Sequence, residues 1–178
     1  MSLFEDLEAE LAAAHDGEFG REVSEMTRTE IARISLVERL VGQVGMSLTL
    51  RSGAGSWSGT LGHVGAEWLV LANGNHSVLV PFSALTEIDG LGVQAGQRPA
   101  GVQARLGFAS ALRVLARERA TVTIHTGQRQ ARLSGMIDRV GSDHCDIAEV
   151  VAGECRRPQH VRRVVTVLLS AISAVESG

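Results

Sequence analysis

Arginine side chains near the C-terminal end are the residues of this sequence most able to do chemistry. The densest cluster consists of Arg156, Arg157, Arg162 and Arg163. Several guanidinium groups close together can neutralise phosphates, so the cluster predicts salt-sensitive binding of nucleic acid. Arg113 and Arg117, one helical turn apart, extend this predicted basic surface. Nearby aromatic residues for base stacking are missing, so little base preference is expected. The alternative interpretation is a solvated edge strand that its charge protects from aggregation.

Two cysteines and two histidines form the one candidate metal-binding set. They are His144, Cys145, Cys155 and His160. Thiolates and imidazoles together could close a tetrahedral zinc site. Their spacing fits no common zinc motif, and Cys145 aligns with Leu69 in an internal repeat, which favours a small buried side chain. We therefore expect neither a metal nor any other cofactor, with zinc as the alternative.

Motifs typical of enzymes are missing from the sequence. It contains no Gly-x-Ser-x-Gly elbow, no phosphate-binding P-loop and no His-Glu-x-x-His zinc motif. The glycine-rich segment 90–96 is too irregular for a dinucleotide-binding fingerprint. No pair of carboxylates stands out from the solvated charges. These observations predict a protein that is not an enzyme.

An internal repeat organises most of the chain. The segment GTLGHVGAEWLVL at 59–71 reappears as GMIDRVGSDHCDI at 135–147, and VPFSALTEI at 80–88 reappears as VLLSAISAV at 167–175. A duplication of this size predicts two copies of one small β module. The 178 residues provide room for both, and 44% hydrophobic residues suffice for their cores.

The hydrophobic period predicts the elements of each copy. Alternation from Met46 onward, with a glycine-rich turn at 52–55 and an Asn-Gly-Asn hairpin at 73–75, predicts five short strands ending near Ile88. A sharply bent sheet that closes on itself would bury the apolar faces of such strands. Trp57 and Trp68 are interpreted as packing in a core or at an interface.

The second copy is predicted to repeat this order. An apolar helical face formed by Phe108, Leu112 and Leu115 precedes strands that begin near Val122. The copy has an extra segment at 148–164, interpreted as a longer hairpin or loop, and the arginine cluster lies in it.

Helices are predicted before the first copy. Ser2 and Glu5 form a capping box for an acidic amphipathic helix within 1–17. A longer helix between Val23 and Gly42 presents one apolar stripe. The stripe is expected to cover the first module, and the alternative is that it binds a partner.

The charge distribution is asymmetric, although the net charge is only −3. Residues 1–40 hold ten acidic residues and four arginines, which gives −6, whereas residues 91–178 hold twelve arginines and seven acidic residues, which gives +5. Opposite charges at the two ends suggest different partners. No signal-peptide pattern and no apolar run of about 18 residues is present, so a cytoplasmic protein without membrane contact is predicted.

The order of helix and five strands, with a glycine in the second strand and the ending VVTVLLSAISAV, resembles the Sm-like (LSm) superfamily and most closely its Hfq branch. The resemblance covers 39–90 and 105–176. It implies five-stranded small β-barrels, ring assembly through edge strands and RNA binding near the last turn. Phe82-Ser83 and Leu169-Ser170 stand where Hfq-type proteins carry Lys-His, so the uridine site is not implied. The whole chain also resembles a group of actinobacterial proteins.

These observations combine into one prediction of fold and function. We expect a mainly β protein with helices: an acidic helix at 1–17, a helix and first Sm-like barrel at 18–90, a Gly/Pro linker at 91–104, and a helix and second Sm-like barrel at 105–178. We expect a homo-oligomeric, non-catalytic RNA-binding regulator that uses the arginines named above. The alternative is a protein-interaction adaptor that uses the N-terminal helices and barrel grooves.

Overall fold

The computed structural model describes residues 32–98, 100, 106–127, 131–150 and 161–177. Packing divides the chain into two units, Met1–Ser35 and Leu36–Gly178, and the second unit contains all the strands. The predicted acidic helix at 1–17 lies outside the described residues. Ile34 and Ser35 are not helical, so the helix expected between Val23 and Gly42 is interrupted before its last turns.

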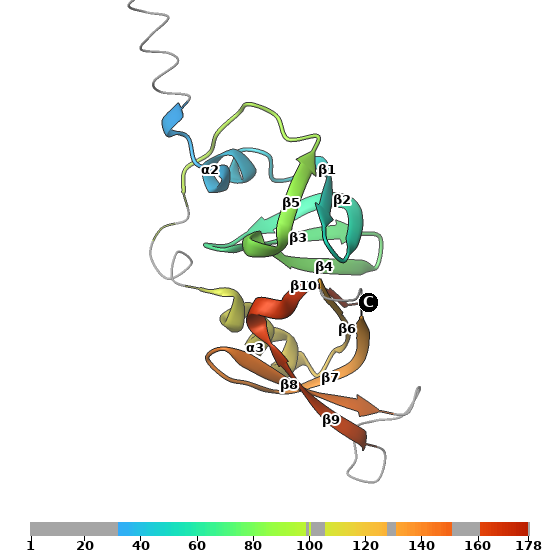
Figure 1. Cartoon of the computed structure of the whole chain (residues 1–178). Coiled ribbons are helices and arrows are strands. Elements are labelled where there is room, and N and C mark those ends of the chain that lie inside the picture. The colour runs from blue at the N-terminus through green and yellow to red at the C-terminus, as the bar shows by residue number, and fades with distance from the viewer. Residues whose placement is uncertain (1–31, 99, 101–105, 128–130, 151–160, 178) are drawn as a thin grey trace, which may run out of the picture. The chain divides into compact units, whose positions relative to one another are not determined.

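The second unit is mainly β. Ten antiparallel strands form one sheet in the order β5-β1-β2-β3-β4-β10-β6-β7-β8-β9 (Figure 1). The strands are β1 (Ser47–Ser52), β2 (Gly55–Val64), β3 (Trp68–Asn73), β4 (His76–Pro81), β5 (Leu85–Asp89), β6 (Thr121–Thr126), β7 (Arg132–Val140), β8 (His144–Val150), β9 (Val161–Leu168) and β10 (Ile172–Ser177). The α-helices described in this unit are α2 (Leu36–Val41) and α3 (Phe108–Glu118).

Local sequence explains where these elements begin and end. Asn73 pairs with His76 across a two-residue turn, and Gly74 has the positive φ of 60° that such a turn requires. Helix α3 buries Phe108 and Leu112, two residues of its predicted apolar face. All five strands predicted in the first copy are present, and the second copy again has one helix followed by five strands.

The sheet is open, and this corrects the expectation of two separate five-stranded barrels. Among the described residues, β5 pairs only with β1, and β9 pairs only with β8. Strand β4 pairs with β10 instead of closing the first set, with Leu79 opposite Val175. One continuous sheet therefore passes through both copies, and we call the β4–β10 pair the junction.

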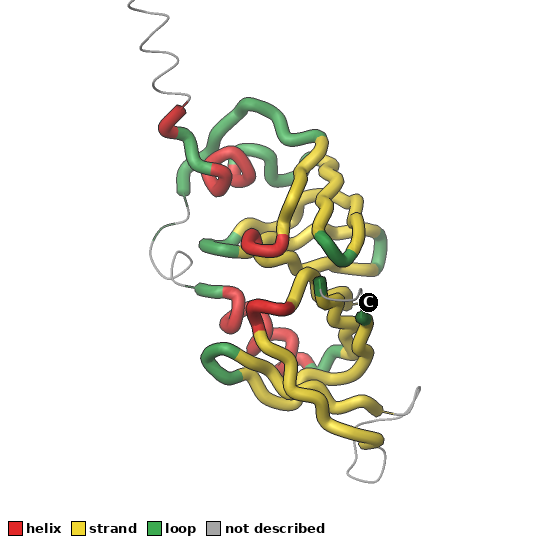
Figure 2. The backbone as a smooth tube through the Cα atoms, viewed as in Figure 1, coloured by secondary structure: helices red, strands yellow, loops and turns green. Residues whose placement is uncertain are grey.

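The two halves repeat their pairing in detail. Leu50 lies opposite Ile88 in the first half, and the equivalent Ile124 lies opposite Val175 in the second. Both second strands, β2 and β7, contain an irregularity at the same place in the repeat. A short 3-10 turn precedes the last strand of each half (Figure 2). The duplication read from the sequence is therefore present in the structure.

Glycine explains one of the repeated features. A Cβ atom at Gly59 would lie 2.6 Å from the carbonyl oxygen of Ala72, and the equivalent Gly135 is crowded in the same way by Ala148. No side chain fits at either position, so the second and third strands of each half can cross closely only with glycine there.

Two hydrophobic cores lie against the sheet, and each takes residues from both halves. The core of the second half includes Trp68 and Leu79 of the first half. The core of the first half includes Ala174 of β10. The junction is therefore packed by side chains on both faces of the sheet as well as by backbone hydrogen bonds.

Candidate interaction surface

The β9 end of the sheet exposes an apolar side chain at a position whose equivalent is buried at the junction. Four consecutive residues at the end of β4, Val78 to Pro81, are buried beside β10. The equivalent residues of β9 are Val165 to Leu168, and Leu168 is 57% exposed. Val164 on the same face of β9 is 53% exposed. Strand β9 therefore presents apolar side chains next to a row of backbone groups that has a described partner on one side only.

The free edges carry opposite charges. Strand β9 contains Arg162 and Arg163, and both are exposed. Strand β5 contains Glu87 and Asp89, which are also exposed. Charged residues on an edge discourage unspecific pairing, and opposite charges on two edges favour pairing between them.

Some of these charged residues already form ion pairs within the chain. Arg163 donates from Nε and Nη2 to the two carboxylate oxygens of Glu149, at 2.7 and 2.9 Å. This bidentate contact lowers the pKa of the Glu149 carboxyl below its usual value. Arg51 donates to Glu87 at 2.6 Å. Each of these two arginines therefore holds a carboxylate of its own half.

The predicted arginine surface is not assembled as a single patch by the described residues. Arg156 and Arg157 lie outside them. Arg162 and Arg163 are consecutive on β9 at an irregularity in its pairing with β8, where Glu149 lies opposite Arg163 and Val150 lies opposite Val161. Helix α3, which carries Arg113 and Arg117, packs mainly on β7.

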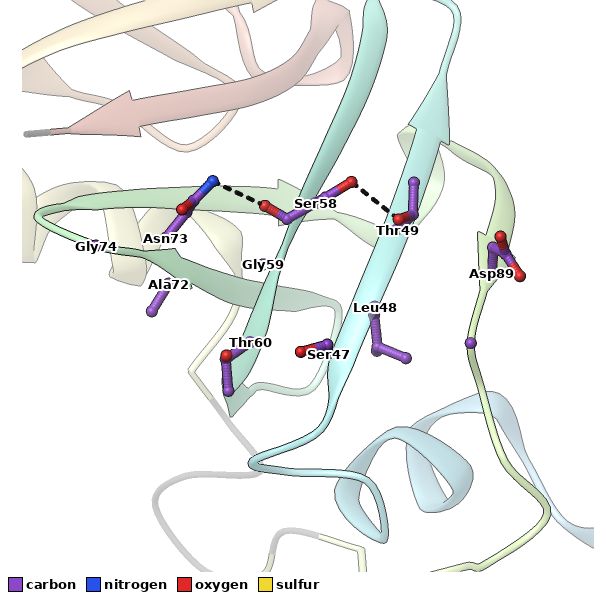
Figure 3. Close-up of a pocket in the computed structure, with 11 residues that line it drawn as sticks. Ser47, Leu48, Thr49, Ser58, Gly59, Thr60, Ala72, Asn73, Gly74 and Asp89 are labelled. Atoms are coloured by element: carbon purple, nitrogen blue, oxygen red, sulfur yellow. Dashed lines mark hydrogen bonds between the residues drawn. The ribbon is translucent and has the colours of Figure 1, made fainter.

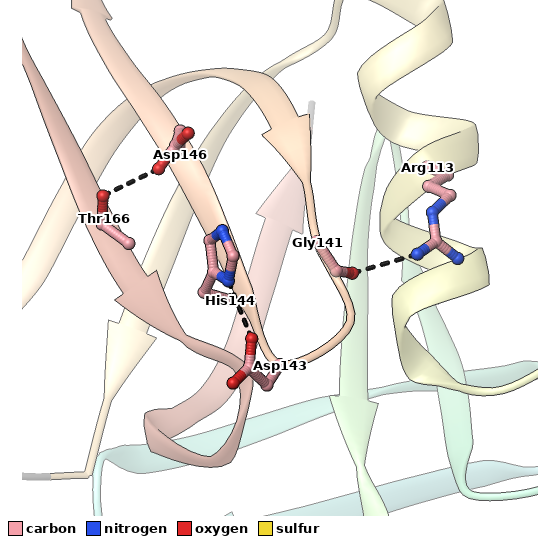
Figure 4. A network of polar contacts seen from close by, with 6 residues as sticks. All are labelled: Arg113, Gly141, Asp143, His144, Asp146 and Thr166. Atoms are coloured by element: carbon pink, nitrogen blue, oxygen red, sulfur yellow. Dashed lines mark hydrogen bonds and ion pairs between the residues drawn. The ribbon is translucent and has the colours of Figure 1, made fainter.

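The α3 arginines have local partners. Arg113 Nη2 donates to the carbonyl oxygen of Gly141 at 3.0 Å (Figure 4). Arg117 Nε donates to the carbonyl oxygen of Arg113 at 3.4 Å. Both arginines also line a cavity whose other walls are largely apolar. Both side chains are exposed and lie one helical turn apart on α3, so two cations face solvent together here.

The two candidate zinc ligands that the structure describes, His144 and Cys145, do not converge. His144 and Cys145 are consecutive on β8 and therefore point to opposite faces of the sheet. Cys145 is fully buried, and burial, with a smaller contribution from the nearby charge of Asp146, raises the pKa of its thiol to about 11. Cys155 and His160 lie outside the described residues, and within those described no three metal-ligating side chains form a group.

His144 has a partner of a different kind. Its Nδ1 lies 2.8 Å from Oδ1 of Asp143 (Figure 4), and this hydrogen bond lowers the pKa of the Asp143 carboxyl. On the same face, Thr166 donates to Asp146 at 2.7 Å. On the outer face of β8 and β9, these polar side chains therefore bind one another beside the exposed apolar side chains of Val164 and Leu168.

Sequence reasoning missed a polar cluster at the junction. Trp57 Nε1 donates to Oε1 of Glu176 at 2.6 Å, and Nε2 of the buried His125 lies 3.3 Å from the other carboxylate oxygen. The Trp57 and His125 rings meet edge to face at 5.5 Å. The three residues come from β2, β10 and β6, so no local pattern could have grouped them. Trp57 and Trp68 are both buried, as predicted.

A polar cavity of about 490 Å³ opens on the first half (Figure 3). The hydroxyls of Thr49 and Ser58 are 2.9 Å apart in its wall, and Asn73 donates to the Ser58 carbonyl oxygen at 3.2 Å. Thr123 and Ser134 repeat the hydroxyl pair in the second half at 3.0 Å. These cross-strand bonds account for the polar lining, so the cavity does not indicate a ligand.

Comparison with known proteins assigns the chain to no family. No protein-family model matches the sequence, and no curated protein matches it either. Within the part of the chain that the structure describes, no helix has the length and apolar character needed to cross a bilayer.

Proposed function

We propose that this protein is a non-catalytic adaptor that binds other polypeptide chains by adding a strand to the β9 edge of its sheet. The observation that supports this best is the exposure of Val164 and Leu168 beside an edge that has no strand partner among the described residues. An added strand would hydrogen-bond to the β9 backbone, and its side chains would cover the exposed ones. Burying the exposed half of each apolar side chain contributes about 1 kcal/mol.

Replacement of the apolar edge residues tests the adaptor function. The double variant Val164→Lys/Leu168→Lys keeps the fold, because both side chains face solvent, but it should no longer retain partners in a ribonuclease-treated pull-down. Val114→Lys is the matched control, since Val114 is 48% exposed on α3 and not on a strand edge. For a purified partner, amide exchange along β9 should slow on binding. Equal retention by all three proteins would reject the proposed edge.

We also propose that each half is an Sm-like module and that one partner of β9 is β5 of a second copy. The repeated order of helix, five strands and a 3-10 turn before the last strand supports the first point. The opposite charges of β5 and β9 support the second. If the register of the junction is repeated between molecules, Ile88 lies opposite Thr166. Because charged residues of opposite sign line the two edges, this contact should be sensitive to salt.

Cysteine cross-linking tests self-association in a Cys155→Ser background. A mixture of the single variants Ile88→Cys and Thr166→Cys should form a disulfide-linked dimer, because directly opposed residues lie within bonding distance. Pairing Ile88→Cys with Val165→Cys is the control, since a shift of one residue points the side chains to opposite faces. If light scattering at tens of micromolar shows only a monomer and no cross-link forms, the proposal of self-association is wrong. The proposed adaptor function would then still be tested separately by the pull-down.

RNA binding is the second candidate function. The exposure of Arg162 on β9, together with the excess of arginine over acidic residues after residue 90, favours it. Changing Arg156, Arg157, Arg162 and Arg163 to Gln should reduce the slope of log affinity against log salt by about 0.7 to 0.9 for each phosphate that no longer has an arginine partner. If the unchanged protein binds no RNA, only the adaptor function remains.

A further inference from the structure

A mainly apolar cavity lies beside α3 at the junction of the two halves. It has a volume of about 360 Å³, and its apolar walls come from Trp68, Val70, Leu79, Leu106, Ala111, Val114 and Leu115. Strands β3 and β4 belong to the first half and α3 to the second. Close packing normally leaves few voids of this size, and cavities between packed modules are frequent ligand sites.

Two hydrogen bonds hold the start of α3 near this cavity. Trp68 Nε1 donates to the Leu106 carbonyl oxygen at 2.8 Å, and the Phe108 N–H donates to Oε1 of Glu67 at 2.7 Å. These bonds position the beginning of the helix against the first half. The cavity is therefore part of a built contact and not a gap between loosely placed segments.

The rim of the cavity has a distinct chemistry. Leu106 and Val114, which are 39% and 48% exposed, are among the most exposed large apolar side chains and both line it. Arg113 and Arg117 line it as well, one helical turn apart. Each has further donors besides the one bonded to a carbonyl oxygen, because a guanidinium has five N–H groups. Among the described residues that line this cavity, none is acidic.

We propose that this cavity binds an aliphatic molecule with a single anionic head group. The apolar tail would occupy the space between Trp68, Leu79 and α3. The head group would accept hydrogen bonds from Arg113 and Arg117, whose planar forks suit carboxylate or phosphate oxygens. The proposal concerns a small-molecule site and is independent of strand addition at β9.

Calorimetric titration of the full-length protein with decanoate tests the site. Saturable binding of one decanoate per chain is expected, with a change in tryptophan fluorescence because Trp68 lines the cavity. Decyltrimethylammonium, which has the same tail and the opposite charge, should bind at least tenfold more weakly. Acetate, which has the head group without the tail, should not bind measurably. Decyl phosphate in place of decanoate distinguishes a phosphate from a carboxylate preference.

Four variants locate the binding. Arg113→Gln and Arg117→Gln should each weaken decanoate binding about tenfold, as expected for removing a charge-assisted hydrogen bond. Arg119→Gln, at the C-terminal cap of α3 and away from the cavity lining, should leave it unchanged. Val114→Phe should narrow the opening and reduce binding without endangering the fold, since Val114 is half exposed. Absence of saturable binding in the unchanged protein would overturn the proposal. Binding that is equal in all variants, or equal for the cationic analogue, would overturn it too.

Discussion

The outer faces of the third and fourth strands differ sharply between the two halves. In the first half this face carries Trp68, Val70 and Leu79, and it packs into the core beneath α3. The equivalent residues of the second half are His144, Asp146 and Thr166, which bind one another or Asp143 at the surface. One copy of the repeat thus has an apolar face because the other copy covers it. No described residues cover the equivalent face of the other copy, and it carries these polar side chains beside the exposed Val164 and Leu168.

The last strands of the halves show the same difference. Strand β10 lies inside the sheet and buries Ile172 to Val175, whereas β5 lies at an edge and exposes Glu87. At the position equivalent to Glu87, β10 has the fully buried Ala174. The two halves therefore share the same backbone pairing. Whether a side chain at a given position is apolar or polar depends on whether a neighbouring element covers it.

Exchanging the residue types at the equivalent positions Ala174 and Glu87 should produce the largest change in stability. Ala174→Glu places a carboxylate in the core of the first half, and Glu176 already occupies the carboxylate position beside His125. An uncompensated buried charge costs about 3 kcal/mol or more, so the midpoint of urea denaturation should fall steeply. Glu87→Ala removes only a surface ion pair and should change stability by less than about 1 kcal/mol. Similar decreases in both variants would contradict the difference between the halves.

A second exchange concerns the outer faces. Leu79→Thr introduces on the covered face the residue type found at the equivalent position of the second half, Thr166. It should lower the free energy of unfolding by about 2 kcal/mol, because it removes buried methyl groups and buries a hydroxyl. The reverse change, Thr166→Leu, should leave the free energy of unfolding almost unaltered. Thermal and urea denaturation of the two variants side by side measures the difference.

Cys145 and its equivalent Leu69 are both fully buried, so the thiol should behave as an apolar side chain. In a Cys155→Ser variant, a thiol reagent at pH 8 should react only after urea unfolding. Because the folded pKa is raised to about 11, the neutral thiol stabilises the folded state below pH 9, and this contribution should be lost as the pH rises from 9 towards 11. Rapid labelling of the folded protein would show that the site opens.

The smallest effect is expected at the ion pair on the β9 edge. Arg163→Gln should raise the pKa of the Glu149 carboxyl towards its usual value, because the bidentate donor is removed. Carbon-detected NMR titration of the glutamate side chains measures this shift. An unaltered titration of Glu149 would mean that the pair does not persist in solution.

Local pattern in the sequence determined most of the elements. Alternation with a period of two placed the strands of the first half, and the Asn73-Gly74 turn joined two of them, because hairpin geometry depends on neighbouring residues. The repeat predicted that Cys145 would occupy the buried position of Leu69. The two predicted halves follow from these short-range rules.

Only the tertiary structure decided which edges meet. Pairing of β4 with β10, and the grouping of Trp57 with His125 and Glu176, join residues far apart in the chain. The sequence pattern of a strand predicts that the strand has an edge, but it does not predict which other strand pairs with that edge. The backbone N–H and C=O groups that form the pairing are the same in every strand. The arginine cluster shows the same limit, since the irregular pairing of β9 with β8 at Arg162, which affects where the adjacent side chains point, depends on the partner strand as well as on the local sequence.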